Sequence, residues 1–181
     1  FLRLGRSADA LTEYERLEKQ LGKDDELLLR EVAVGFITPV LKDMREQMRG
    51  AGYTALKELN SDEAVPYLED GLSDGSGLVR ALAAEGLGRL KAGQRSSRLR
   101  KATEDQAAMV RTAVLKGLGL VTETDLGGGE SQYEWAGGDG HHHLVCGRCG
   151  HVTLLDDRHM KALGKGIMAS YGFRADLGHF D

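Results

Sequence analysis

The chain of 181 residues contains few residues of several types that are typical of particular protein classes. It holds two cysteines, two prolines and one tryptophan, and aromatic residues make up only 6%. Two cysteines exclude a disulfide framework, and no apolar run approaches the roughly 20 residues of a membrane helix. No basic-then-apolar leader opens the sequence, so we expect a cytoplasmic protein without membrane contact. The formal charge of -4 argues against a basic, nucleic-acid-binding surface along the whole chain.

Histidine and cysteine are also absent from the whole of residues 1–140. Any thiol or imidazole chemistry is therefore confined to the C-terminal part, and the chain is expected to consist of two modules. The residues that carry this chemistry are His141, His142, His143, Cys146, Cys149, His151, His159 and His179.

The N-terminal part contains an internal repeat. Segments that begin at Met48, Val79 and Val110 lie 31 residues apart, and an aspartate precedes each of them by five positions. Each unit indicates a helix, a short polar turn and a second helix, so neighbouring units must stack to bury their apolar stripes. Positions in the same phase are Asp43, Asp74 and Asp105; Ile37, Leu68 and Leu99; Arg49, Arg80 and Arg111; and Leu56, Leu87 and Leu118.

The aspartate in the turn, followed by Val-Arg and small residues, resembles the HEAT-repeat family over roughly residues 31 to 121. Such repeats usually span about 40 to 47 residues, so the shorter spacing predicts trimmed helices or turns. The resemblance implies an α-solenoid over residues 31–119 that binds an unidentified protein partner. We expect the turn aspartates to form local salt bridges or caps, and a phosphate-binding stripe is an alternative role for the arginines.

Residues 1–30 precede the repeats and predict one amphipathic helix. It faintly resembles half of a tetratricopeptide unit, and the simpler interpretation is a helix that covers the exposed edge of the first repeat. Its apolar positions are Leu4, Ala8, Leu11, Tyr14, Leu17 and Leu21.

The helical pattern stops at Leu120. Residues 120–135 predict a β-hairpin with a glycine turn, and residues 141–155 predict a second pair of strands with Cys-x-x-Cys in their turn. A helix opened by Asp156 or Asp157 and a further strand from Phe173 complete the pattern. The expected fold class is therefore α+β: a HEAT-like α-solenoid followed by a small α/β domain over residues 120–181.

A domain of this size needs a staple such as a metal or a partner subunit. Cys146 and Cys149 suit two positions of a zinc tetrahedron, with His151 or another histidine as a candidate further ligand. A redox pair is the alternative, but the strand-like residues on both sides disfavour it.

A second set of donors lies beside the thiols. Alternation along a strand places His141 and His143 on one side and His142 on the other, where His179 is its candidate companion. Glu134 on the preceding strand can reach the first two imidazoles. This mixed donor set suits iron(II), manganese, zinc or nickel.

The segments YEW, HHHLVCGRCGHV, DD and YGFRADLGHF, at these spacings, resemble the C-terminal domain of the ferric uptake regulator (Fur) family. These proteins are metal-responsive bacterial transcription repressors, and the domain senses metal and forms a homodimer. The resemblance begins near Leu118. It implies Glu134, His141 and His143 as regulatory-metal ligands, Cys146 and Cys149 as the first pair of a structural zinc site, and His142 and His179 as members of an additional site.

The chain also departs from that family. Met160 or Lys161 stands where a glutamate ligand is usual, and no second Cys-x-x-Cys follows, so the zinc site is expected to be incomplete. The family's winged helix is missing, and Val110–Val121 fits both its last helix and the third repeat. We therefore identify no DNA-binding residue, expect DNA binding only where a winged helix is completed, and expect a fragment or a fusion.

The sequence predicts a metal-responsive transcriptional regulator of Fur type, whose DNA binding is controlled by a divalent metal. The alternative is a HEAT-repeat protein-interaction scaffold without DNA binding. No nucleophile, base and orienting residue stand together, so we expect no enzyme.

Overall fold

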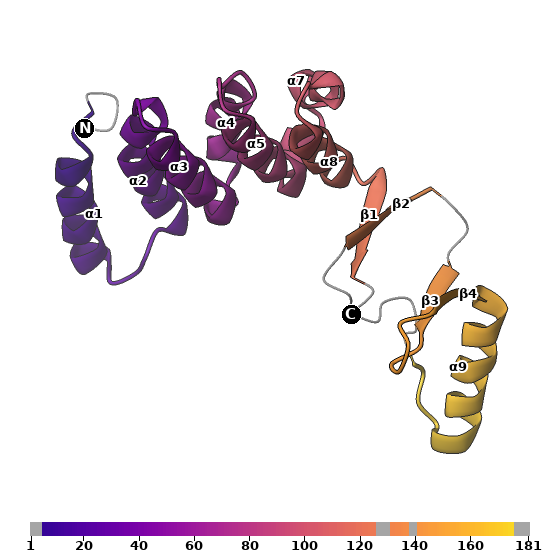
Figure 1. Ribbon diagram of the computed structural model, residues 1–181. Helices are drawn as coiled ribbons and strands as arrows, with labels where there is room; N and C mark the ends of the chain where they lie inside the picture. The colour runs from indigo at the N-terminus through magenta and orange to yellow at the C-terminus, as the bar shows by residue number, and fades with distance from the viewer. Residues whose placement is uncertain (1–4, 126–130, 138–140, 176–181) are drawn as a thin grey trace. The chain divides into compact units, whose positions relative to one another are not determined.

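The computed structural model describes residues 5–125, 131–137 and 141–175. The chain divides into two compact units, the helical unit (residues 1–120) and the C-terminal unit (residues 121–181). The expected α+β fold class is confirmed (Figure 1). The helices of the first unit are α1 (Ser7–Leu21), α2 (Glu26–Ile37), α3 (Glu46–Leu59), α4 (Val65–Gly71), α5 (Gly77–Arg89), α6 (Lys91–Gln94), α7 (Ser97–Lys101) and α8 (Ala108–Gly117), with short 3-10 helices η2 (Thr38–Lys42), η3 (Asp62–Ala64) and η4 (Ala102–Glu104).

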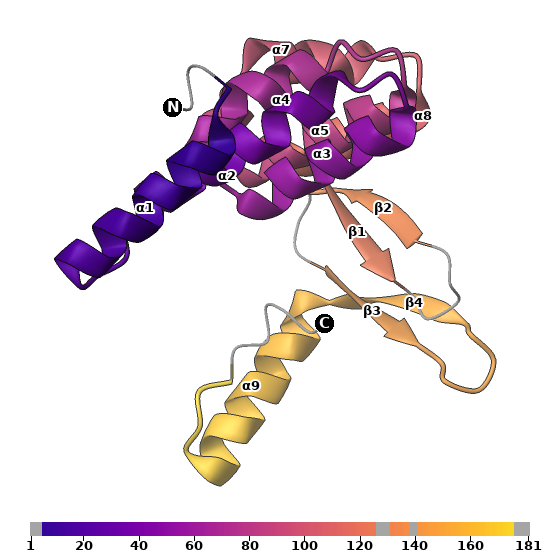
Figure 2. The ribbon, with the colours of Figure 1, turned by 90° about the vertical axis from the view of Figure 1, so that its left-hand side faces the viewer.

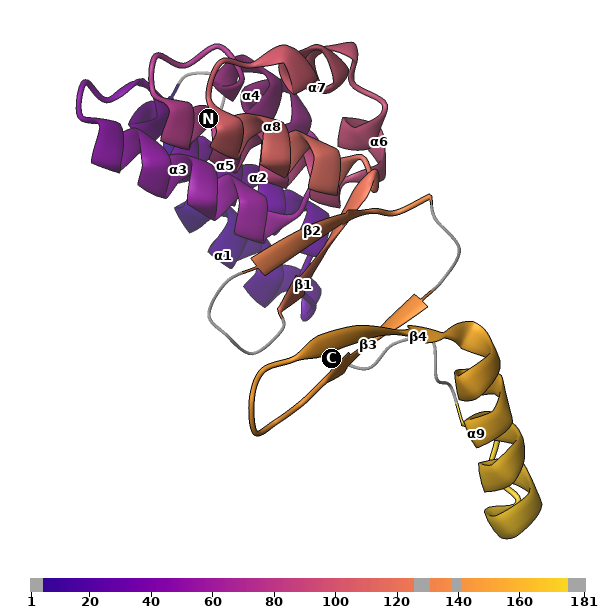
Figure 3. The ribbon, with the colours of Figure 1, turned by 45° about the vertical axis from the view of Figure 1, so that its right-hand side comes forward.

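The second helices of the three repeats, α3, α5 and α8, lie side by side with α5 in the middle (Figure 3). Apolar residues at the repeated positions form the core, because Leu56, Leu68, Leu87 and Leu99 are all fully buried. The first helix of the third repeat is reduced to the short pieces α6 and α7. The first helix of the second repeat is also short, because α4 has seven residues and α7 has five. Both agree with the trimmed helices expected from the 31-residue spacing.

Two glycines set the distance between α5 and α8. A Cβ atom built on Gly117 would lie 2.7 Å from the Cα atom of Gly88, so neither position has room for a side chain. The helix backbones therefore touch, and the two glycines are required by packing despite their cost in helix propensity.

The N-terminal helix α1 packs on α2 (Figure 2). Ala10 and Tyr14 of α1 form a small cluster with Val32 of α2. Of the predicted apolar stripe, Ala8 and Leu21 are exposed and Leu4 lies outside the described residues. The helix forms as expected, but its buried face is narrower than the sequence suggested.

An arginine–aspartate ladder joins each repeat to the next. Arg49 donates through Nε and Nη2 to the Asp74 carboxylate at 2.7 and 2.9 Å, and Arg80 binds Asp105 in the same way at 2.8 and 2.9 Å. The Nη1 atom of each arginine donates to two carbonyl oxygens of its own turn. These two arginines are therefore committed to carboxylates inside the array and do not form a phosphate-binding stripe.

The turn aspartates also make the local caps that were expected. Asp43, Asp74 and Asp105 each accept a hydrogen bond from the backbone N–H two residues later, at 2.8 Å. The hydrogen bonds from Arg49 and Arg80 lower the pKa values of Asp74 and Asp105. Among the described residues, no arginine from a preceding repeat binds Asp43, and the hydrogen bond from its neighbour Arg45 lowers its pKa to about 2.

The C-terminal unit consists of two hairpins and one helix. Strand β1 (Val121–Asp125) pairs antiparallel with β2 (Ser131–Trp135), and β3 (His141–Val145) pairs antiparallel with β4 (Val152–Asp156). Helix α9 (Asp157–Tyr171) follows, and Asp156 caps it by accepting from the Arg158 N–H at 2.9 Å. No strand forms at residues 173–175, and the rest of the predicted last strand lies outside the described residues.

This unit buries little apolar surface. Met160 is the one hydrophobic side chain in its described part that counts as buried. Trp135, Leu154 and Phe173 are 64%, 66% and 72% exposed. The described part of this unit therefore leaves much of its apolar surface exposed.

Candidate metal centre

The two cysteines lie in the tight turn between β3 and β4. The Cys146 N–H donates to the His151 carbonyl at 2.9 Å, and the Gly150 N–H donates to the Cys146 carbonyl at 2.8 Å. Gly150 has φ +69°, a left-handed conformation that glycine adopts without strain. Both thiols are free and exposed, so the turn presents them to solvent.

The turn also favours the thiolate form of Cys146. Backbone N–H groups of Arg148 and Cys149, followed by the Cys149 thiol, donate hydrogen bonds to the Cys146 sulfur and lower its pKa. Thiolates are the form that binds metal ions. Sequence reasoning did not single out Arg148, whose contribution is a backbone amide set by the Cys-x-x-Cys spacing.

The second donor pair joins the two hairpins. His143 Nε2 on β3 lies 2.9 Å from Glu134 Oε1 on β2, and the two side chains are 13% and 27% exposed. Strands β2 and β3 belong to different sheets, so this contact links the hairpins through side chains. A carboxylate and an imidazole placed together in a partly buried site have the donor chemistry of a transition-metal centre.

The remaining candidates are distributed as follows. His142 is half-buried and lies opposite Leu155 in the β3–β4 register, whereas His143 lies opposite Leu154. Successive residues of a strand face opposite sides, so His142 is directed away from the Glu134–His143 pair. The side chain of His141 and the whole of His179 lie outside the described residues.

No three histidine, cysteine, aspartate or glutamate side chains converge within the described part of the chain. The structure therefore offers two separate donor pairs, Glu134 with His143 and Cys146 with Cys149. Each fits part of a metal's coordination sphere, with thiolates suited to zinc and the mixed pair to harder divalent ions.

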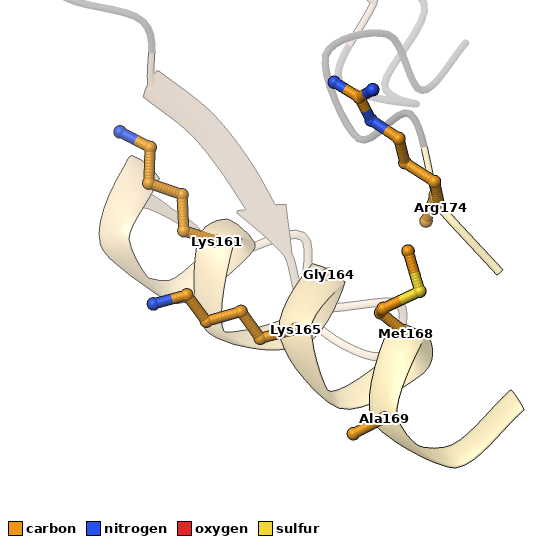
Figure 4. Close-up of a pocket in the computed structure, with 7 residues that line it drawn as sticks. Lys161, Gly164, Lys165, Met168, Ala169 and Arg174 are labelled. Carbon is orange, nitrogen blue, oxygen red and sulfur yellow. The ribbon is translucent and has the colours of Figure 1, made fainter. Parts of the chain in front are cut away.

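A pocket on α9 lies apart from these donors. It is lined by the basic side chains of Lys161, Lys165 and Arg174 and by apolar atoms of Met168. Figure 4 shows both lysine ammonium groups on the far side of the helix from Arg174. The cations do not converge on a common point, and none of the predicted metal ligands whose side chains are described lines the pocket.

Comparison with known families agrees with this division of the chain. Residues 34–119 match the model of HEAT repeats, and residues 110–177 match the model of the ferric uptake regulator family. The expected resemblance of the C-terminal part to the ferric uptake regulator family, after HEAT-like repeats, is thus confirmed. No curated protein matches the chain.

The two matches share residues 110–119, which include most of α8. In the structure this helix packs on α5 as the second helix of the third repeat. Across the described residues, no helix is both long and apolar enough to span a membrane.

Proposed function

We propose that the C-terminal unit is a metal-responsive, dimerising regulatory module of Fur type. Glu134, His141 and His143 bind a divalent transition metal such as iron(II), zinc, manganese or nickel, and Cys146 and Cys149 bind a structural zinc ion. The observation that carries this proposal is the 2.9 Å contact between Glu134 and His143 from separate hairpins. The match to the ferric uptake regulator family supports it.

The chain's own residues suggest how such a site transmits a signal. The side chains of Glu134 and His143 bring the two hairpins into contact, and the described part of the unit has little apolar core. When bound, a divalent cation supplies a positive charge that the carboxylate and the neutral imidazole share as ligands. Ligands from both hairpins then favour one mutual arrangement of the hairpins, which is what a two-state sensor requires.

The regulatory output of this module is a homodimer whose affinity for DNA depends on metal. Trp135 is exposed next to Glu134 on β2, and Leu154 is exposed opposite His143 in the β3–β4 register. These two side chains form the apolar surface that a second copy covers. Helix α8, in contrast, is engaged by α5, and Arg111 holds its N-terminal turn to the carbonyl of Asp105. We therefore expect weak or no operator binding by this chain alone, and no catalysis.

Cobalt(II) titration followed by absorption spectroscopy tests the metal site. Replacing His141 and His143 together with alanine is expected to weaken cobalt(II) binding by about tenfold or more, and Glu134→Gln is expected to act in the same direction. His159→Ala is the matched control, because this exposed imidazole lies on α9 and belongs to none of the predicted ligand sets. Unchanged affinity in the double variant overturns the assignment of these ligands.

The thiol pair is tested separately in the same titration. Thiolate ligation of cobalt(II) gives a charge-transfer band, which Cys146→Ser abolishes and His141→Ala/His143→Ala leaves in place. A nanomolar, sequence-specific gel shift by this chain would contradict the expectation of weak operator binding.

The second candidate is a HEAT-repeat interaction scaffold that does not bind DNA. It is favoured by the match over residues 34–119 and by the complete, well-packed core of the helical unit. If the chain shows no metal affinity in either cobalt(II) experiment, the scaffold is the better conclusion.

A further inference from the structure

The repeated positions of the helical unit show what each end of the array lacks. In the interior, an arginine of one repeat binds the turn aspartate that lies 25 residues later, as Arg49 does with Asp74 and Arg80 with Asp105. Both arginines also hold two carbonyl oxygens of their own turn. Each interior interface therefore contains five hydrogen bonds. The guanidinium donates two to the carboxylate and two to the carbonyl oxygens of its own turn, and the carboxylate accepts the fifth from the backbone N–H two residues later.

At the C-terminal end, Arg111 makes two of these five hydrogen bonds. Its Nη1 atom donates to the carbonyls of Asp105 and Gln106 at 2.8 and 3.1 Å, which orients the guanidinium as in Arg49 and Arg80. The residue 25 positions later is Ala136, and no carboxylate in the described part of the chain accepts from Arg111 Nε or Nη2. The arginine is thus preoriented with its carboxylate-binding edge unused.

Burial along the same helix shows the same open end. Leu56 and Leu87 are fully buried at equivalent positions of α3 and α5, whereas Leu118, the equivalent residue after α8, is only half-buried. Arg80 is 8% exposed, and Arg111 is half-buried. Helix α8 therefore carries the same kind of surface that α5 uses to contact α8. Among the residues that the structure describes, no following repeat covers this surface on α8.

At the N-terminal end of the array the aspartate is present and the arginine of the ladder is missing among the described residues. Asp43 is the one turn aspartate of the described ladder that no arginine from a preceding repeat reaches, and Arg45 binds it instead. Met48 is 36% exposed, although Val79 and Val110 at the equivalent positions are fully buried. Met44, next to Asp43, is 97% exposed. This end offers a carboxylate and apolar surface.

We propose that these complementary ends join two copies of the chain head to tail. Arg111 of one copy binds the Asp43 carboxylate of the next, which repeats the interior Arg80–Asp105 interface between molecules. In the register of the interior helices, where Gly77 meets Ala107 and Gly88 meets Gly117, Met44 and Met48 then lie beside the N-terminal turn of α8, and Leu118 packs on the C-terminal half of α3. The Arg45 side chain is 69% exposed, and exposed ion pairs contribute little, so an arginine already oriented by two carbonyls displaces it readily. Such an interface is heterologous, so it forms rings or open chains rather than a closed dimer.

Sedimentation velocity of the full chain over a wide concentration range tests this assembly. The measurements are made with EDTA present, so that metal-dependent association through the C-terminal unit does not contribute. We expect concentration-dependent species larger than a dimer at low salt, and fewer at high salt. Arg111→Asp should remove them, whereas Arg95→Asp, on an exposed loop of the same unit, should not.

Two further variants act in opposite directions and separate docking from misfolding. Arg45→Ala removes the competing guanidinium, so it should tighten self-association by a few-fold, an effect that a damaged fold would not produce. Asp43→Arg and Arg111→Asp should each fail to assemble alone, but their mixture should form a one-to-one complex through the reversed pair. Circular dichroism of each variant confirms that its helices are retained.

A single sedimenting species that Arg111→Asp leaves unchanged would overturn the proposal. Weaker association of Arg45→Ala, or no complex between the two folded charge-reversal variants, would do the same. None of these outcomes depends on the metal site, so failure here leaves the proposed regulatory function standing.

Discussion

Arg80 and Asp105 form a two-point ion pair that spans 25 residues of sequence and links the second repeat to the third. Their side chains are 9% and 12% exposed, and the Arg80 Nη1 atom additionally holds the carbonyl oxygens of Asp74 and Gly75. One arginine thereby fixes its own turn and the turn of its neighbour. The pair therefore couples the turns of two neighbouring repeats.

Replacing Arg80 is accordingly expected to destabilise the helical unit strongly. Arg80→Met leaves the largely buried Asp105 carboxylate without its cation, and we expect a loss of about 3 kcal/mol in the free energy of unfolding. Urea unfolding followed by circular dichroism measures this change. Arg89→Ala is the control, because its pair with Glu58 is 49% and 61% exposed and should be worth at most about 1 kcal/mol. Equal effects of both variants would contradict the coupling role of Arg80.

The ladder also predicts how stability depends on pH. The folded-state pKa values of Asp74 and Asp105 are lowered by their arginines, and that of Asp43 is lowered to about 2 by Arg45. A lowered carboxyl pKa stabilises the folded state above the unfolded value of about 3.9, and this stabilisation disappears as pH falls through the folded value.

The helical unit should therefore lose stability progressively from about pH 4 towards pH 2, whereas stability between neutral pH and pH 5 should be flat with respect to these groups. Urea midpoints measured across this range test the expectation. Asp105→Asn should be less stable at neutral pH and should show a shallower decline in acid. A variant with the same acid slope as the parent would show that Asp105 does not contribute to it.

The contact between Gly88 and Gly117 predicts that replacing Gly88 with alanine lowers the stability of the helical unit, although alanine has the higher helix propensity. Alanine is intrinsically favoured over glycine inside a helix by about 1 kcal/mol, yet a Cβ atom on Gly88 would overlap the backbone of Gly117. We expect Gly88→Ala to destabilise the unit by about 1 to 3 kcal/mol.

Gly50→Ala is the matched control for this substitution. Gly50 lies in α3, is buried like Gly88, and its added Cβ would meet only the Leu82 Cδ1 atom at an ordinary 3.8 Å. This variant should be neutral or slightly stabilising in thermal unfolding. If Gly88→Ala is also neutral, the close approach of α5 and α8 is not required for stability.

The repeat spacing in the sequence predicted the helices, the turns and the shared phase of the ladder residues. It did not predict which aspartate each arginine binds. Local salt bridges of the turn aspartates were expected, but Arg49 binds the carboxylate of Asp74 in the next repeat. The pairing depends on how one repeat stacks on another, which the turn sequences alone do not encode. Asp43 shows the difference, since without a preceding arginine it pairs locally with Arg45.

The C-terminal unit was predictable at the level of single hairpins. Strand alternation placed Glu134 within reach of the His143 face, and the structure brings these two side chains together. Their ligand role stays a prediction, as do those of His141, His142, Cys146, Cys149 and His179. Sequence could not foresee that β2 and β3 belong to separate sheets, because hairpin signals define neighbouring strands and not contacts between hairpins.

Trp135, the single tryptophan, gives a direct test of dimerisation through the C-terminal unit. Its side chain is 64% exposed and follows Glu134 on β2, so its emission should resemble that of a solvated indole at low concentration. If a second copy covers this surface, the emission maximum should shift to shorter wavelength as concentration rises, and divalent metal should lower the concentration required.

Leu154→Lys should suppress that shift, because it places a charge on an exposed apolar position opposite His143. Leu27→Lys is the control: Leu27 is equally exposed at 67% but lies on α2 of the helical unit. The control should shift as the parent does. An emission change that is lost in Arg111→Asp but retained in Leu154→Lys would place the dimer interface in the helical unit. If each unit has its own interface, we expect the emission change to be lost in Leu154→Lys and retained in Arg111→Asp.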